Sequence, residues 1–152
     1  MGEMELPTVR EALPGDEAAW RRLWAGYTSW YKAHVPDDVT AATWARILDP
    51  GSAIFCRVAE SDGVVVGFAV CILHAGTWVV DPICYLEDLF VDPGARGVGV
   101  GSALVQDLID LGRSRGWARL YWHTQTGNEA ARRIYDRFTA VDDFVRYQLA
   151  LK

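Results

Sequence analysis

The chain has 152 residues, of which 51% are hydrophobic and 23% are charged, and its formal net charge is −5. This length and composition predict one compact domain with a hydrophobic core over residues 1–152. The negative charge disfavours non-specific nucleic-acid binding, which needs clustered Lys and Arg. The longest apolar stretches, such as residues 64–73, are too short to span a bilayer. Neither nucleic acid nor a membrane is therefore an expected partner, and the lack of a readable secretory signal predicts a cytoplasmic protein.

Cysteine and histidine are too few and too scattered for a disulfide framework or a metal centre. The odd number of cysteines predicts free, buried thiols at Cys56, Cys71 and Cys84. His34, His74 and His123 are far apart in the sequence, and the pair Cys71-x-x-His74 stands alone. We therefore expect no metal.

The first half of the chain predicts a strand, two helices and a hairpin. A strand is expected over residues 9–13, and Asp16 is a plausible N-cap for a helix that runs to about residue 34. A second helix should begin after Thr40 and end near Leu48. Residues 53–60 and 64–73, joined by Ser-Asp-Gly, should form an antiparallel hairpin.

The second half alternates strands and helices. In chain order it predicts a strand over 85–91, a glycine-rich loop over 92–101, a helix over 102–115, a strand over 119–124, a helix over 128–138 and a last strand over 144–151. Strands and helices mixed in this order predict an α/β fold around one sheet.

The glycine-rich loop reads Arg-Gly-Val-Gly-Val-Gly-Ser over residues 96–102 and leads into the predicted helix. Unpaired N–H groups and the positive end of the helix dipole favour phosphate oxygens there, and glycines allow a close approach. A Walker loop is excluded because no lysine precedes Ser102, and the spacing of glycines does not fit a dinucleotide fingerprint. Two interpretations of the loop remain: a diphosphate-binding site that needs no metal, and a glycine-rich turn that binds no ligand.

The Arg-x-x-Gly-x-Gly pattern resembles the coenzyme A pyrophosphate loop of the GNAT superfamily of N-acetyltransferases. Residues 85–93, Tyr-Leu-Glu-Asp-Leu-Phe-Val-Asp-Pro, are similar to the fourth strand of that family, close to its spermidine/spermine acetyltransferase branch. Residues 121–124 resemble yeast polyamine and histone acetyltransferases, and the Asn128-x-x-Ala131-x-x-x-Tyr135 pattern resembles the last helix motif. The resemblance implies a mixed, mostly antiparallel central sheet flanked by helices, with a splayed pair of parallel strands.

The resemblance also implies acetyl-CoA as co-substrate and positions for its binding. The loop residues Arg96, Gly97, Val98, Gly99, Val100, Gly101 and Ser102 would hold the pyrophosphate. On the preceding strand, the Leu89 amide would stabilise the oxyanion, and Phe90 and Val91 would pair with pantetheine amides. Asn128 is equally well explained as a cofactor contact and as the N-cap of its helix.

Acetyl transfer to a primary amine needs a base and an acid, because such an amine is protonated at neutral pH. By the resemblance, Glu87 is the base, acting directly or through water, and Asp88 should point to the opposite face of the strand unless a bulge re-aims one of them. Tyr135, which shares a helix side with Asn128 and Ala131, is the candidate acid that protonates the leaving thiolate.

The acceptor amine is the least defined part of the prediction. The aromatic residues of the first helix form either a core face or a substrate wall, in which Tyr27 and Trp30 with the carboxylates of Asp37 and Asp38 would bind a cation. Glu87 and Asp88 are the candidate substrate contacts on the strand. A polyamine, an amino acid and a protein lysine all remain open. The resemblance further implies a homodimer. The competing hypothesis is a non-catalytic acyl-CoA-binding or regulatory module.

Overall fold

The computed structural model describes residues 6–152, and its centre is a five-stranded sheet with the strands in sequence order. The strands are β1 (Thr8–Glu11), β2 (Ile54–Ser61), β3 (Val64–His74), β4 (Ile83–Val91) and β5 (Arg119–Trp122). The first three pairings are antiparallel and the last, β4 with β5, is parallel. The predicted mixed, mostly antiparallel α/β sheet is confirmed.

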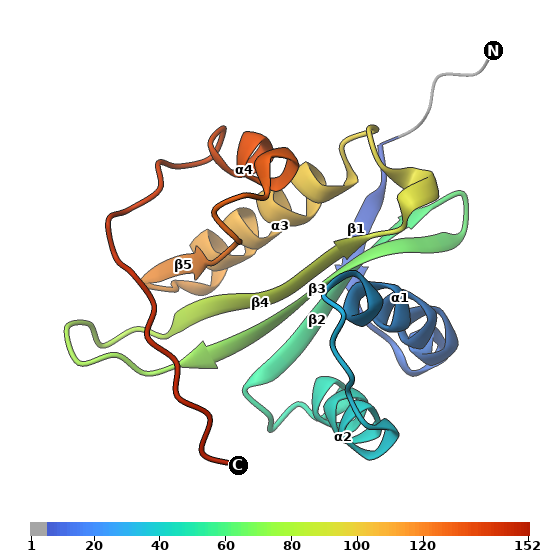
Figure 1. Cartoon of the computed structure of the whole chain (residues 1–152), viewed down its shortest axis with the longest axis horizontal. Helices are drawn as coiled ribbons and strands as arrows, with labels where there is room; N and C mark the ends of the chain where they lie inside the picture. Colours follow the sequence, from blue (N-terminus) through green and yellow to red (C-terminus); the bar gives the residue numbers. More distant parts are fainter. Residues whose placement is uncertain (1–5) are drawn as a thin grey trace.

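Helices cover both faces of this sheet (Figure 1). α1 (Glu17–Trp30) and α2 (Asp37–Leu48) pack on one face, and α3 (Val100–Arg115) and α4 (Glu129–Tyr135) lie on the other. Short 3₁₀ turns precede α1 at Pro14–Asp16 and follow β4 at Pro93–Ala95. Each face has its own core, one centred on Trp20 and Phe68, the other on Leu104 and Leu108. Burial of these large side chains is the main force that holds the helices on the sheet.

Two irregularities of β4 prepare the site. Val70 of β3 faces Asp88 while the next residue, Cys71, faces Leu86, so Glu87 is an extra residue in a β-bulge. The parallel pairing with β5 ends at Leu86 and Trp122, although β4 continues to Val91. The expected splay of the parallel pair is therefore present, and the second half of β4 faces no strand on that side.

The ends of several helices differ from the predictions. α1 stops at Trp30 rather than near residue 34, because Lys32 adopts a left-handed φ of 52° and the amides of Lys32 and Ala33 bond back to the last turn. α2 begins at Asp37, before Thr40, and α3 begins at Val100 rather than at residue 102. Turn-forming side chains and the last apolar contact set these ends, and a periodic pattern does not show either.

The prediction that Asp16 caps α1 is wrong. Its side chain makes no cap bond to the helix. It accepts instead from the Leu13 amide at 2.8 Å and from both terminal nitrogens of Arg10 at 2.8 and 3.0 Å. An arginine on the neighbouring strand thus takes the carboxylate away from the helix terminus.

The predicted last strand is also absent. α4 ends at Tyr135, not at residue 138, and residues 144–151 pair with no strand in the described part of the chain. The three cysteines are free and buried, as predicted. Among residues 6–152, no helix is long and apolar enough to cross a membrane.

Candidate active site

A cleft of about 1110 Å³ opens where β4 parts from β5. Its walls come from the second half of β4, the glycine loop, α4, the end of β5 and the last turn of α1. Most of the predicted site residues line it: Glu87, Leu89, Phe90, Val91, Arg96, Gly97, Gly99, Val100, Gly101, Ser102, Asn128, Tyr135, Tyr27 and Trp30. The fold thus brings together residues of α1, of β4 with the glycine loop that follows it, and of α4 with its N-cap.

Two predicted residues, Val98 and Asp88, are not among the lining residues. The side chain of Val98 packs against the core under α3, as does the buried Val100. These valines anchor the loop to the domain, which leaves the glycines and the backbone between them to face the cleft.

The geometry of the glycine loop fits a diphosphate. Gly97 and Gly99 have φ angles of 85° and 87°, which other residues rarely adopt, and a Cβ added at either would meet no atom within 4 Å. Gly99 is the N-cap residue of the 16-residue helix α3. The unpaired amides of its first turn and its dipole therefore face open space that an anion can enter.

Arg96 is held by the protein on three sides. Its Nε donates to the Val91 carbonyl at 3.0 Å. Its guanidinium lies 5.3 Å from the ring centroid of Phe90 and 5.7 Å from that of Trp30. Arg96 thus ties the glycine loop to β4 and to the end of α1, and it keeps a positive charge at the edge of the cleft.

The two adjacent carboxylates of β4 have different surroundings. Glu87, in the bulge, is exposed and borders the cleft. Asp88 is half-buried, and the hydroxyl of Tyr27 from α1 is close enough to influence its carboxyl. Burial raises the pKa of Asp88 from 3.8 to about 6, the Tyr27 hydroxyl opposes this rise, and the charge of Glu87 adds to it. Asp88 therefore supports Tyr27, and Glu87 is the carboxylate that faces the cleft.

Tyr135 lies in the last turn of α4, with its ring edge-on to Trp122 of β5 at a centroid distance of 5.4 Å. Burial raises the pKa of its hydroxyl to about 12, with a smaller contribution from Tyr31. The hydroxyl consequently stays protonated at any physiological pH. At the N-terminus of α4, the Asn128 side chain accepts a hydrogen bond from the Ala131 amide at 3.2 Å. The interpretation of Asn128 as the N-cap of this helix is confirmed.

The aromatic face of α1 divides between the core and the cleft. Trp20 is fully buried and stacks on Trp24 at 5.0 Å. Further along the helix, Tyr27, Trp30 and Tyr31 line the cleft, and Trp30 is 61% exposed. The core interpretation is confirmed for the first half of the helix, and the substrate wall stays a prediction for the second half, which lines the cleft.

Several lining residues are not among the predicted site residues, and Arg137 and Tyr31 are two of them. Arg137 reaches across from the end of α4 to within 3.5 Å of the Ser102 hydroxyl, which places a second cation beside the loop. Tyr31 follows the last residue of α1 and packs on Tyr27 at 5.2 Å. Tyr31 could have been found from its spacing of four residues from Tyr27. Arg137 lies beyond its helix, so helical periodicity could not place it.

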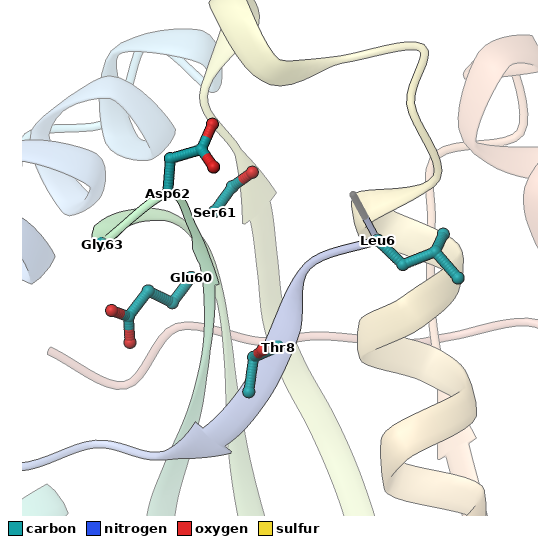
Figure 2. Close-up of a pocket in the computed structure, with 6 residues that line it drawn as sticks. All are labelled: Leu6, Thr8, Glu60, Ser61, Asp62 and Gly63. Carbon is teal, nitrogen blue, oxygen red and sulfur yellow. The ribbon is translucent and has the colours of Figure 1, made fainter. Parts of the chain in front are cut away.

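A second, smaller hollow of about 280 Å³ lies at the β2–β3 turn (Figure 2). It holds none of the predicted site residues, and its Glu60 carboxylate accepts from Arg10 at 2.8 Å. Within residues 6–152, no group of three or more His, Cys, Asp or Glu side chains is placed to hold a metal ion.

Comparison with known proteins gives a consistent family. Residues 17–139 match the model of the Acetyltransferase (GNAT) family. The chain is 32% identical over 142 residues to a D-amino-acid N-acetyltransferase of Saccharomyces cerevisiae, covering 92% of this chain and 88% of that protein. It is 31% identical over 150 residues to the thialysine N-epsilon-acetyltransferase of Bos taurus, covering 91% and 86% of the two chains.

Solved structures agree on the fold. A probable acetyltransferase superposes with a TM-score of 0.84 at 19% identity, covering 95% of this chain and 98% of the other. An aminoglycoside N-acetyltransferase in complex with CoA superposes with a TM-score of 0.74 at 22% identity, covering 97% of each chain. The matched family model and the full-length relatives together show that this chain belongs to the GNAT acetyltransferase family, acyltransferases that use acetyl-CoA as co-substrate.

Proposed function

We propose that this protein is an N-acetyltransferase that moves the acetyl group of acetyl-CoA to the primary amine of a small molecule or a protein lysine. The observation that carries the proposal is the meeting of Glu87, Tyr135 and the glycine loop in one cleft. A module that only binds acyl-CoA needs the loop but has no use for a base and an acid beside it.

The loop binds the diphosphate of CoA in this proposal, and the free side of β4 binds the thioester end. Gly97, Gly99 and the first amides of α3 supply the anion site. Arg137 adds a positive charge next to Ser102. In the described residues, β4 has no strand partner beyond Leu86 on that side, which supports a role for the Leu89 amide as the donor to the thioester oxygen.

Glu87 is the proposed general base. It takes a proton from the ammonium group of the acceptor, directly or through water, and the neutral amine then attacks the acetyl carbon. The Leu89 amide donates to the oxygen that becomes negative. The exposed position of Glu87 keeps it within reach of both the cleft and solvent, to which it returns the proton.

Tyr135 is the proposed general acid. When the tetrahedral intermediate collapses, the carbon–sulfur bond breaks and the thiolate of CoA takes the hydroxyl proton. A phenol with a pKa of about 12 is fully protonated before this step. The positively charged nitrogen of the intermediate loses its second proton to solvent as the amide forms, and the phenolate recovers a proton from solvent as CoA leaves.

The acceptor is proposed to enter on the α1 side, beside Tyr27, Trp30 and Tyr31. Aromatic faces attract cationic amines and the apolar carbons next to them. Relatives of this chain include acetyltransferases of D-amino acids, thialysine and aminoglycosides, compounds that carry amino groups. Asp88 acts indirectly, by orienting the Tyr27 hydroxyl.

A panel of amines tests the proposal. Wild-type protein is incubated with acetyl-CoA and, separately, with D- and L-amino acids, thialysine, polyamines, an aminoglycoside and a lysine peptide, and free CoA is measured with a thiol reagent. Amine-dependent release of CoA, with an acetylated amine detected by mass spectrometry, is expected. Binding of acetyl-CoA without release for any of these amines would favour the non-catalytic alternative.

A further inference from the structure

The last turn of α1 and the glycine loop are joined by a cation held between two aromatic rings. The guanidinium of Arg96 lies 5.3 Å from the ring centroid of Phe90 in β4 and 5.7 Å from that of Trp30, the last residue of α1. The Nε of Arg96 donates to the Val91 carbonyl at 3.0 Å, which fixes the direction of the side chain. The acceptor side of the cleft and the cofactor loop therefore meet at one charged residue.

The two rings hold this cation without using its hydrogen-bond donors. A ring attracts a guanidinium through its π face, whereas a carboxylate would also accept its N–H groups. Among residues 6–152, the terminal nitrogens of Arg96 make neither a hydrogen bond nor an ion pair. Because Arg96 lines the cleft, these donors are available to an anion such as the diphosphate of CoA.

The helix that carries Trp30 is fixed on β4 and on the start of the loop. Gly26, one turn before Trp30, lies so close to the Phe90 ring that an added Cβ would be 3.1 Å from its Cζ. Earlier in the helix, Arg22 forms an ion pair with Asp92 at 3.1 Å. These contacts set the distance between α1 and the loop, so the fold itself brings the Trp30 ring to Arg96.

Burial does not account for a tryptophan at the end of α1. Trp20, on the same helix, is fully buried, but Trp30 is exposed and is not a member of the core cluster on its side of the sheet. Within the described part of the chain, the Trp30 ring lies against the Arg96 cation and stacks on no other aromatic ring. The π face is therefore the property of Trp30 that the structure uses.

We propose that Trp30 is a positioning residue for the cofactor, which acts through Arg96 by holding the guanidinium at the edge of the cleft, where its terminal nitrogens bind the diphosphate of CoA. This inference rests on the proposed function, which places the diphosphate at the glycine loop and the acceptor beside Trp30. One residue of the acceptor wall thus contributes to the affinity for CoA without touching CoA.

The Kd of CoA for the full chain, measured by calorimetry without any amine, tests the proposal. Trp30→Leu should raise this Kd about two- to fivefold, the effect of losing an exposed cation–π contact. Trp30→Phe keeps a π face and should lie closer to the wild type. The matched control Trp78→Leu removes an exposed tryptophan that is not among the residues of the cleft and should leave the Kd unchanged. Equal Kd values for the wild type and Trp30→Leu, or for the Leu and Phe variants, would overturn the proposal.

A double-mutant cycle shows whether Trp30 acts through Arg96. Arg96→Gln alone should raise the Kd of CoA by more than Trp30→Leu does, because it removes the charge itself. In the Arg96→Gln background, Trp30→Leu should have no further effect. Additive effects would mean that Trp30 contacts CoA directly or only supports the fold, and would contradict the proposal.

These measurements separate the positioning role of Trp30 from folding and from catalysis. Both side chains are exposed, so the variants should fold, which circular dichroism and urea unfolding verify. Only binding of CoA is measured. A wild type that releases no CoA with any amine would therefore refute the proposed function and leave this comparison intact, whereas an active wild type with no effect of Trp30→Leu would refute the role of Trp30 alone.

Discussion

Replacing Tyr135 by Phe removes one hydroxyl and keeps the ring that packs edge-on against Trp122 at 5.4 Å. Stability should therefore change little, within about 0.5 kcal/mol. With a pKa of about 12, the hydroxyl is ionised in only about one molecule in 10⁴ at pH 8, so the wild-type acid is present in full. Loss of a general acid lowers turnover by about 10²- to 10⁴-fold, or roughly 3–5 kcal/mol of transition-state stabilisation.

The assay measures free CoA release under saturating amine and acetyl-CoA, with the Kd of CoA determined by calorimetry. The expected result is a lower kcat with a nearly unchanged Kd, because the hydroxyl acts only as the thiolate leaves. Raising the pH should not restore the variant, and wild-type activity should show no alkaline loss from Tyr135 below about pH 11. Wild-type turnover in the variant would remove Tyr135 from the mechanism.

Three further predictions concern the loop and the carboxylates of β4. Glu87→Gln should lose most activity at low pH, where more of the amine is protonated, and recover in part as the pH rises; a pH-independent loss in kcat/KM would contradict its role as base. Gly101→Ala, whose Cβ would lie 3.7 Å from Ile134, should fold normally and raise the Kd of CoA. Gly99→Ala, at a φ of 87°, should raise this Kd as well and should also lose about 1–2 kcal/mol of stability, measured by urea unfolding. Unchanged CoA affinity in both variants would reject the loop as the binding site. The pKa of Asp88 is higher in the folded chain than in the unfolded one, so the folded state binds more protons, and ionisation of Asp88 destabilises the fold as pH rises from about 4 to 7. Relative to the wild type, Asp88→Asn should therefore gain stability across this pH range, by up to about 3 kcal/mol. A difference in stability that does not change with pH would refute this prediction.

The β2–β3 hairpin could be predicted because a short-range pattern determines it. Asp62 and Gly63 both adopt positive φ, as the tight turn of the predicted hairpin requires. Glycine spacing before the amphipathic helix α3 likewise predicts an anion site without any knowledge of the fold. These features depend on residues that are close together in the sequence.

The remaining differences come from contacts between distant residues. Asp16 binds Arg10 of the adjacent strand, and Asp88 turns toward Tyr27 because a bulge at Glu87 shifts the faces of β4. Neither partner is visible in the local sequence. The alternating pattern of residues 144–151 predicts a strand, but these residues form none and pair with no strand in the described part of the chain.

The measurement that tests the central claim most directly is amine-dependent CoA release by the Glu87→Gln/Tyr135→Phe double variant, compared with the wild type at equal acetyl-CoA occupancy. Both substitutions nearly keep the size of the side chain, so the double variant should still bind CoA with the wild-type Kd. The account predicts release by the wild type and a loss of at least about 10²-fold in the double variant. Equal rates in the two proteins would contradict the assignment of acid and base to this cleft.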